Sequence, residues 1–276
     1  MNWDRLGRVA PTALADSRVE LHWAAQVLAA CADRWVEARP DDSHTTMEWD
    51  AAQGALVGQS GPAEAPLSLR VADLALLLAG EELPLAGRTL ADALAWADGR
   101  IAAAAGAAPR GVHPRDYDMP PHGVTGGAPF APDPDALAEL ARWYAAGDAM
   151  LRDIAGREPG ATAVRCWPHH FDIAAILFID TERTRESARQ IGFGLSPGDR
   201  HFAEPYFYVT PYPIEIDVTF PPLPSGGRWQ RTDFTGAILL ASDLLQGPPE
   251  GQLERARVWF DAAFAVGRHL IGVRSP

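Results

Sequence analysis

The order in which helical and extended patterns alternate along the chain constrains the fold more than any other feature of the sequence. Apolar side chains recur at helical spacing in four segments, and in the first of them Leu21, Leu28 and Trp35 lie on one stripe. Asp16 or Ser17 is suited to cap this first helix, and a threonine is suited to cap the second. The four predicted helices cover residues 16–38, 87–106, 135–155 and 252–272, and the candidate cap of the second helix is Thr89.

Short extended segments separate these helices, and glycine- or proline-rich turns follow several of them. Turn sequences such as AAQG and SPGD favour hairpins, so neighbouring strands are expected to pair antiparallel. The sequence therefore predicts an α+β fold in which antiparallel sheet segments pack with about four main helices. The predicted strands lie within residues 43–50, 67–74, 163–180, 188–195 and 204–210.

The helix–strands–helix layout occurs twice, once on either side of a connector. Residues 107–134 are dense in proline and glycine and have no periodicity. Long connectors without structure of their own are uncommon in compact domains, and they are usually functional or mobile. We therefore divide the chain into two similarly arranged halves, 1–106 and 135–276, which are expected to form one compact unit. The shared layout suggests an internal duplication.

Charge and hydropathy exclude several classes of partner. The formal net charge is −12 and no basic cluster offsets it, which argues against nucleic acid and against an anionic membrane surface. No apolar stretch approaches the length of a membrane span, and the N-terminus lacks the apolar core of a secretory signal. We therefore expect a cytoplasmic protein in which Cys31 and Cys166 are buried thiols.

The chain contains no lysine, and all of its 24 residues with a permanently positive side chain are arginine. This absence excludes Schiff-base chemistry, pyridoxal phosphate anchored on lysine, and the lysine of a nucleotide-binding P-loop. No G-x-G-x-x-G motif opens a helix after a strand, so a Rossmann dinucleotide site is not expected either.

Titratable side chains are concentrated in RCWPHHFD, residues 165–172. If this stretch is a strand, His170 and Asp172 are neighbours on one face, about 7 Å apart, and His169 lies on the apolar face. Such a pair could supply ligands to a divalent metal, completed by other histidine or carboxylate groups. The alternative is structural: a hydrogen-bonded histidine–aspartate pair at a strand end, with His169 packed beside Trp167.

A second histidine, His44, begins the extended segment 43–50 in the first half. If the halves are duplicated, it occupies the position that His169 and His170 occupy in the second half, and the two strand starts could converge. The metal-ligand candidates are then His44, His169, His170 and Asp172. Alternatively, His44 is a solvated residue of an Asp-Ser turn.

The segment EPYFYVTPYP places Glu204, Tyr206 and Tyr208 on one strand face. A carboxylate beside several phenols could line a small-molecule pocket, or the same residues could form a packed sheet surface. In the first predicted helix, His22 and Gln26 are one turn apart and could reach a cleft, although a histidine on a helix flank is often only half-buried.

Four blocks carry a resemblance to a known family. They are SRVELHWAAQVL, CWPHHFDIA, LSPGDRHFAEPYFYVTPYP and TDFTGAILLASDL, in that order along the chain. Together they resemble an uncharacterised bacterial family, a domain of unknown function. The resemblance implies an α+β fold and a bacterial cytoplasmic protein, and it supplies no activity, cofactor or catalytic residue. In the family pattern, small or polar residues occupy the positions of Pro168, His169 and His170, which leaves Asp172 as the more general feature.

These features predict a cytoplasmic small-molecule-binding protein or enzyme. Its polar site would lie at the sheet edge, formed by His44, His170 and Asp172 with the strand of Tyr206 and Tyr208, and a divalent metal is one candidate cofactor. The alternative is a non-catalytic interaction or structural domain whose aromatic surface binds a partner protein or a second copy of the chain.

Overall fold

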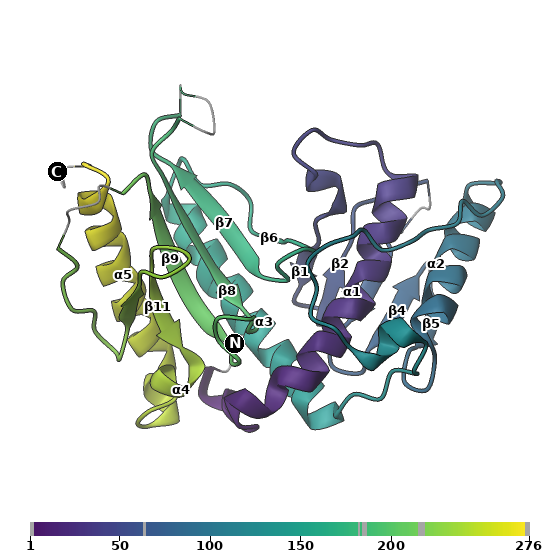
Figure 1. Ribbon diagram of the computed structural model, residues 1–276, viewed down its shortest axis with the longest axis horizontal. Helices are drawn as coiled ribbons and strands as arrows, with labels where there is room; N and C mark the ends of the chain where they lie inside the picture. Colours follow the sequence, from purple (N-terminus) through teal and green to yellow (C-terminus); the bar gives the residue numbers. More distant parts are fainter. Residues whose placement is uncertain (1–2, 63–64, 182, 184–186, 215–218, 274–276) are drawn as a thin grey trace. The chain divides into compact units, whose positions relative to one another are not determined.

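The computed structural model describes residues 3–62, 65–181, 183, 187–214 and 219–273 (Figure 1). The chain forms two compact units. The α1 unit comprises Ala13–Ala145 and Arg165–Phe171, and the α5 unit comprises Met1–Thr12, Ala146–Val164 and Asp172–Pro276. Both contain an antiparallel sheet and helices, so the predicted α+β class is confirmed.

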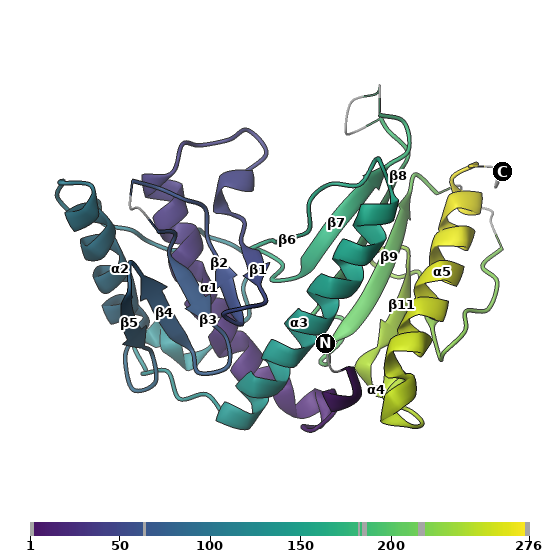
Figure 2. The same ribbon diagram turned by 180° about the vertical axis from the view of Figure 1, so that it is seen from behind.

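The sheet of the α1 unit is a five-stranded meander in chain order. Leucines 56, 69, 76 and 83 lie in register across it with Trp49, and all five side chains are buried. Helices α1 (Ala15–Trp35) and α2 (Leu90–Ala104) cover one face of the sheet (Figures 1 and 2). The strands are β1 (Glu48–Asp50), β2 (Ala55–Val57), β3 (Ser68–Arg70), β4 (Ala75–Leu78) and β5 (Glu81–Pro84).

The two helix starts in this unit differ in how they are capped. Thr89 caps α2 as predicted, and it forms a reciprocal capping box with Asp92. The start of α1 has no side-chain cap, because the 3-10 turn η2 (Pro11–Leu14) runs directly into it. Ser17, expected as a cap, instead accepts a hydrogen bond from the backbone N–H of Asp133.

The proline- and glycine-rich connector is tied to α1 and α2 along its length. Asp98 of α2 accepts hydrogen bonds from the N–H groups of Arg110 and Gly111. Arg115 forms an ion pair with Asp33, and Glu20 accepts the N–H of Ala131 at 2.9 Å. The connector, which includes the short 3-10 helix η4 (Gly123–Gly126), is therefore a strap with defined anchors.

The α5 unit has five strands in the order β10-β11-β9-β8-β7, each antiparallel to its neighbour. One face is apolar, and α5 (Gln252–Leu270) packs on it through Phe260 against Phe207 and Phe264 against Phe193. Figure 2 shows α3 (Pro134–Arg157) on the same side as α5. The strands are β7 (Ile173–Phe178), β8 (Gln190–Ser196), β9 (Tyr206–Tyr212), β10 (Arg228–Gln230) and β11 (Gly236–Leu240), and the short helix α4 (Ala241–Leu244) follows β11.

A glycine permits the close approach of α3 to this sheet. A Cβ atom at Gly147 would lie 2.5 Å from Cδ2 of Leu195, so a larger residue would require Leu195 or the helix to shift. Helix α3 is also where the two units divide, because residues up to Ala145 belong to one unit and those from Ala146 to the other. The units thus differ in their bounds from the predicted halves 1–106 and 135–276.

Among the described residues, no helix combines the length and the apolar character needed to cross a membrane.

Candidate functional site

The α5 unit has a second sheet face, opposite the one on which α5 packs, and its residues alternate along each strand with those of the α5-covered face. On β8 this face carries Gly192, Gly194 and Ser196, and on β9 it carries Tyr206, Tyr208 and Thr210. Asp172 stands directly before β7, so its side chain reaches the edge of the same face. The face therefore combines polar groups with glycines at alternate positions, which differs from an ordinary apolar sheet surface.

Tyr208 and Asp172 form the first polar pair on this face. The Tyr208 hydroxyl donates to Oδ2 of Asp172, which is buried. The phenol reaches Asp172 by lying across Gly194, where a Cβ atom would come within 2.5 Å of the Tyr208 hydroxyl oxygen. Burial, and next the charge of Asp172, hold the pKa of Tyr208 well above its ordinary value. Tyr208 therefore remains a protonated hydrogen-bond donor.

Tyr206 and Asp199 form a second pair beside the first. The Tyr206 hydroxyl donates to Oδ2 of Asp199 at 2.6 Å, and Oδ1 of Asp199 accepts the N–H groups of His201 and Phe202 at 2.7 and 3.0 Å. Burial, followed by the charge of Asp199, raises the pKa of Tyr206. The rings of Tyr206 and Tyr208 have centroids 6.2 Å apart, so the two pairs adjoin. We call Asp172, Asp199, Tyr206 and Tyr208 the tyrosine–aspartate cluster.

Aromatic side chains pack around this cluster. Phe202 contacts Tyr206 edge-to-face at 4.9 Å, and Phe234 packs against the buried group of Tyr206, Ile238 and Leu240. Glu204, predicted on the same face, has a different role. Its carboxylate accepts the backbone N–H of Ser242 at 2.6 Å and the Ser242 hydroxyl at 2.9 Å, and so holds the start of α4.

The stretch 165–172 does not form the continuous strand that the sequence suggests. The strand β6 (Arg165–Cys166) ends at Cys166, and residues 168–170 form a turn closed by a hydrogen bond from the Phe171 N–H to the Trp167 carbonyl at 2.7 Å. Phe171 has a left-handed backbone, with φ of 60°. Because the alternation of a strand is lost in the turn, the predicted face assignments for His169 and His170 were wrong. Both residues are exposed.

His22 and Gln26 of α1 hold this turn. The Nε2 atoms of His22 and Gln26 hydrogen-bond the same carbonyl, that of Pro168, at 2.8 and 2.7 Å. The His22 ring also stacks on Phe171, with centroids 4.5 Å apart and planes within 6°. Burial lowers the pKa of His22 to about 4, so the ring is neutral and its Nε2–H donates. His22, predicted as a ligand-binding candidate, thus makes a structural tie within its unit.

His44 is neither a strand residue nor solvated. It lies in the 3-10 turn η3 (Ser43–Thr45) and is only 1 % exposed. Its Nδ1 accepts the backbone N–H of Arg39 at 3.2 Å, and its Nε2 lies 3.6 Å from Asp33 and 3.4 Å from Arg115. Within the described part of the chain, no three or more His, Cys, Asp or Glu side chains gather in a geometry that could hold a metal ion. The predicted site of His44, His169, His170 and Asp172 is therefore not assembled.

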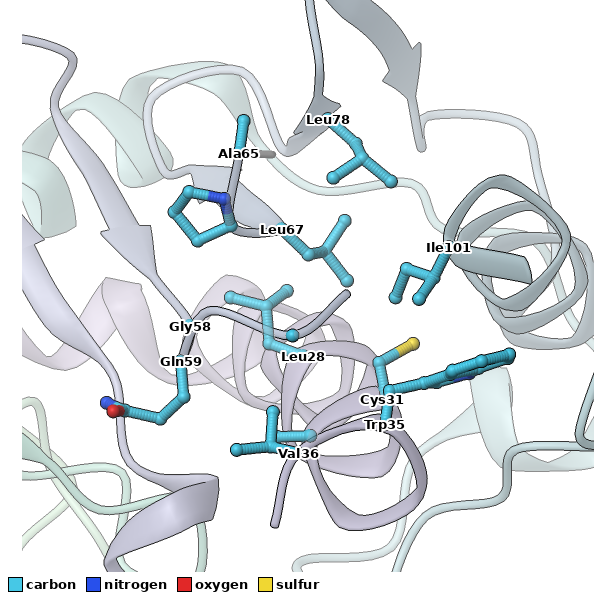
Figure 3. A pocket seen from close by; sticks show the side chains of 13 residues that line it. Leu28, Cys31, Trp35, Val36, Gly58, Gln59, Ala65, Leu67, Leu78 and Ile101 are labelled. Atoms are coloured by element: carbon cyan, nitrogen blue, oxygen red, sulfur yellow. The ribbon is translucent and has the colours of Figure 1, made fainter. Parts of the chain in front are cut away.

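The α1 unit contains a small apolar cavity (Figure 3). Its volume of about 20 Å³ has room for roughly one water molecule, too little for an organic ligand. Cys31 faces it, and burial raises the pKa of the Cys31 thiol to about 12, which makes the thiol unreactive. The cavity is lined chiefly by Leu28, Cys31, Trp35, Leu67, Leu78 and Ile101.

Two residues of the cluster environment were not identified from the sequence. Asp199 was assigned only to the SPGD turn, and Gly194 was given no role. The spacing G-x-G at 192–194 within a strand was the available signal, because glycine inside a strand often marks a position that another group covers closely.

No family model, no curated protein and no solved structure matches the chain at a significant level. The resemblance drawn from the four sequence blocks therefore stays a prediction.

Proposed function

We propose that the protein binds a small polar molecule at the tyrosine–aspartate cluster, as a cytoplasmic binding protein or an enzyme. The observation that supports this proposal is the pairing of two phenols, on the sheet face opposite α5, with two carboxylates at the margin of that face. The carboxylate of Asp172 is buried and that of Asp199 is half-buried, and burying such a group costs free energy that an apolar surface would avoid. Concentrations of such groups favour a functional site over a merely packed surface.

The cluster defines the chemistry of its ligand. The phenols of Tyr206 and Tyr208 stay protonated and donate their protons to Asp199 and Asp172, so the hydroxyl and carboxylate oxygens of the cluster offer acceptors to a ligand. The adjacent ring of Phe202 offers an apolar contact. A molecule with hydroxyl or ammonium groups on a compact carbon skeleton matches this combination.

The alternative of an aromatic interaction surface has less support. Among the described residues, the large hydrophobic side chains that are exposed are Tyr212 at 53 % and Val258 at 42 %. Two isolated side chains do not make the contiguous apolar patch that marks a protein interface. The small-molecule hypothesis therefore agrees better with the surface.

The test is a ligand-observed NMR screen of sugars, polyols and amino acids against the wild type and three variants. Tyr208→Phe removes the hydroxyl that donates to Asp172, and Gly194→Ala displaces the phenol, because the new Cβ would lie 2.5 Å from the Tyr208 hydroxyl oxygen and 2.8 Å from the Ile173 carbonyl oxygen. For compounds that bind the wild type, each of these two variants should lower affinity about tenfold or more, the effect of losing a hydrogen bond to a charged group.

The matched control is Tyr212→Phe, which removes the hydroxyl of an exposed tyrosine on the same strand. It should leave affinity unchanged. The proposal fails if no compound of these classes binds the wild type, or if the compounds bind Tyr208→Phe and Gly194→Ala as well as they bind the wild type while circular dichroism shows all variants folded.

A further inference from the structure

Two exposed imidazoles lie next to each other on the turn of the α1 unit. The ring centroids of His169 and His170 are 4.2 Å apart, with planes inclined by 50°. His169 also contacts the rings of Trp167 and Tyr117, at centroid distances of 6.1 and 5.7 Å. The structural tie formed by His22 and Gln26 does not involve the side chains of these two histidines, so both rings are available from solvent.

The backbone that carries the two rings is fixed. The carbonyl of Pro168, directly before His169, receives the hydrogen bonds of His22 and Gln26, and the Phe171 N–H closes the turn directly after His170. A ligand pair on an ordered turn loses less conformational entropy on binding than the same pair on a flexible loop.

The chemistry of the pair favours a metal ion of borderline softness. Neutral imidazole is a preferred ligand of Cu²⁺, Ni²⁺ and Zn²⁺, and of these divalent ions Cu²⁺ generally binds nitrogen sites most tightly. The carboxylate of Asp42 lies near enough to interact electrostatically with His169, and its negative charge favours a cation at this position.

We propose that His169 and His170 together bind one transition-metal ion, Cu²⁺ in preference to Zn²⁺, with water in the remaining coordination positions. This site is smaller than the four-ligand site predicted from the sequence, and it uses the two candidate histidines that the structure places side by side. It lies in the α1 unit and does not depend on the small-molecule site proposed for the α5 unit.

Calorimetric titration of tag-free protein with Cu²⁺ tests this proposal, together with the nitrogen hyperfine pattern in electron paramagnetic resonance. The variants are His169→Ala, His170→Ala, their combination, and His113→Ala as the matched control, since His113 is an exposed histidine of the same unit. Residues that only hydrogen-bond to a metal ligand are worth about 10- to 100-fold in metal affinity, so loss of a direct ligand should cost at least about tenfold.

The expected result is one tight Cu²⁺ per wild-type chain with two coordinating nitrogens. Each single variant should bind at least about tenfold more weakly, and His113→Ala should bind like the wild type. Both histidines are exposed, so these changes leave the fold intact. A wild-type affinity no better than that of the double variant overturns the proposal, as does an equal loss in His113→Ala.

Discussion

His22 shows how a single buried side chain makes the stability of the α1 unit depend on pH. The ring is 7 % exposed, stacks on Phe171 and donates to the Pro168 carbonyl, and its burial favours the neutral form more strongly than this hydrogen bond favours the charged form. Its pKa in the folded protein is about 4, compared with 6.5 for an unperturbed histidine. The folded state therefore excludes a proton that the unfolded chain binds between these two values.

The sign of the effect follows from this difference. Above pH 6.5 neither state carries the proton, so the tie contributes its full stability. As the pH falls from 6.5 towards 4, the unfolded state gains the proton and the free energy of unfolding decreases, by about 3 kcal/mol in total. Urea unfolding at pH 7 and pH 4.5 measures this loss.

The variant His22→Gln isolates the contribution, because glutamine can still donate to the Pro168 carbonyl but does not titrate. The difference in stability between the two pH values should be smaller in His22→Gln than in the wild type, whereas His113→Gln should behave like the wild type. Equal pH dependence in all three proteins would show that His22 titrates normally in the folded state.

At the level of secondary-structure elements, Asp98 connects α2 to α1 and to the strap through its hydrogen bonds. Its carboxylate accepts the Trp35 indole N–H at 2.8 Å, the Gly111 N–H at 2.8 Å and the Arg110 N–H at 3.2 Å. Asp98 is 3 % exposed, so removing it leaves the buried indole N–H of Trp35 without its acceptor and releases the two backbone N–H groups of the strap.

Asp98→Ala should lower the free energy of unfolding by about 2 kcal/mol, since the orphaned Trp35 donor is buried and such a donor costs about 1–3 kcal/mol, whereas water can reach the N–H groups of residues 110 and 111. Hydrogen exchange at residues 110 and 111 should accelerate more than exchange in the centre of α2. Asp98→Asn, which keeps one acceptor oxygen, should recover part of both effects. Unchanged exchange at the start of the strap in Asp98→Ala would mean that other contacts anchor it.

The sequence predicts features that are fixed within a single helix or strand, and it misses those that depend on contacts between elements. Helix periodicity and a cap such as Thr89 are local signals, and α2, α3 and α5 lie close to their predicted positions. The alternation of β9 correctly grouped Tyr206 with Tyr208, because a strand imposes a period of two. The turn at 168–170 was missed, since it depends on a positive φ at Phe171 and on ties from α1 that are distant in sequence.

Asp199 was missed for a related reason. It lies on a turn, where no periodicity indicates which way a side chain points, and its partner Tyr206 is recognised only once β8 and β9 are paired. The prediction that His44 joins His169, His170 and Asp172 at one metal site was wrong, because it assumed that the two halves of the chain are duplicates with equivalent strand starts. His44 instead lies in a 3-10 turn and contacts Arg39, Asp33 and Arg115.

At the scale of the whole molecule, the chain passes between its two units four times, after Thr12, Ala145, Val164 and Phe171. The second of these passages lies inside α3, which continues without a break from Pro134 to Arg157. Unfolding either unit therefore removes one end of a helix whose hydrogen bonds continue into the other. Such connectivity favours a single cooperative transition over two independent ones.

Cys31 and Cys166 allow this to be tested, because both thiols are buried in the α1 unit and neither forms a disulfide. Thiol labelling across a urea series reports the α1 unit, and the fluorescence of Trp229 and Trp259, measured in a variant whose other tryptophans are replaced by phenylalanine, reports the α5 unit. We expect coincident midpoints.

Gly194→Ala, which overpacks the α5 unit and should cost about 1–3 kcal/mol, should shift both midpoints equally. Val258→Ala, at an exposed position, should shift neither. If Gly194→Ala moves the fluorescence transition and leaves the thiols protected, the units unfold separately and the continuity of α3 does not couple them.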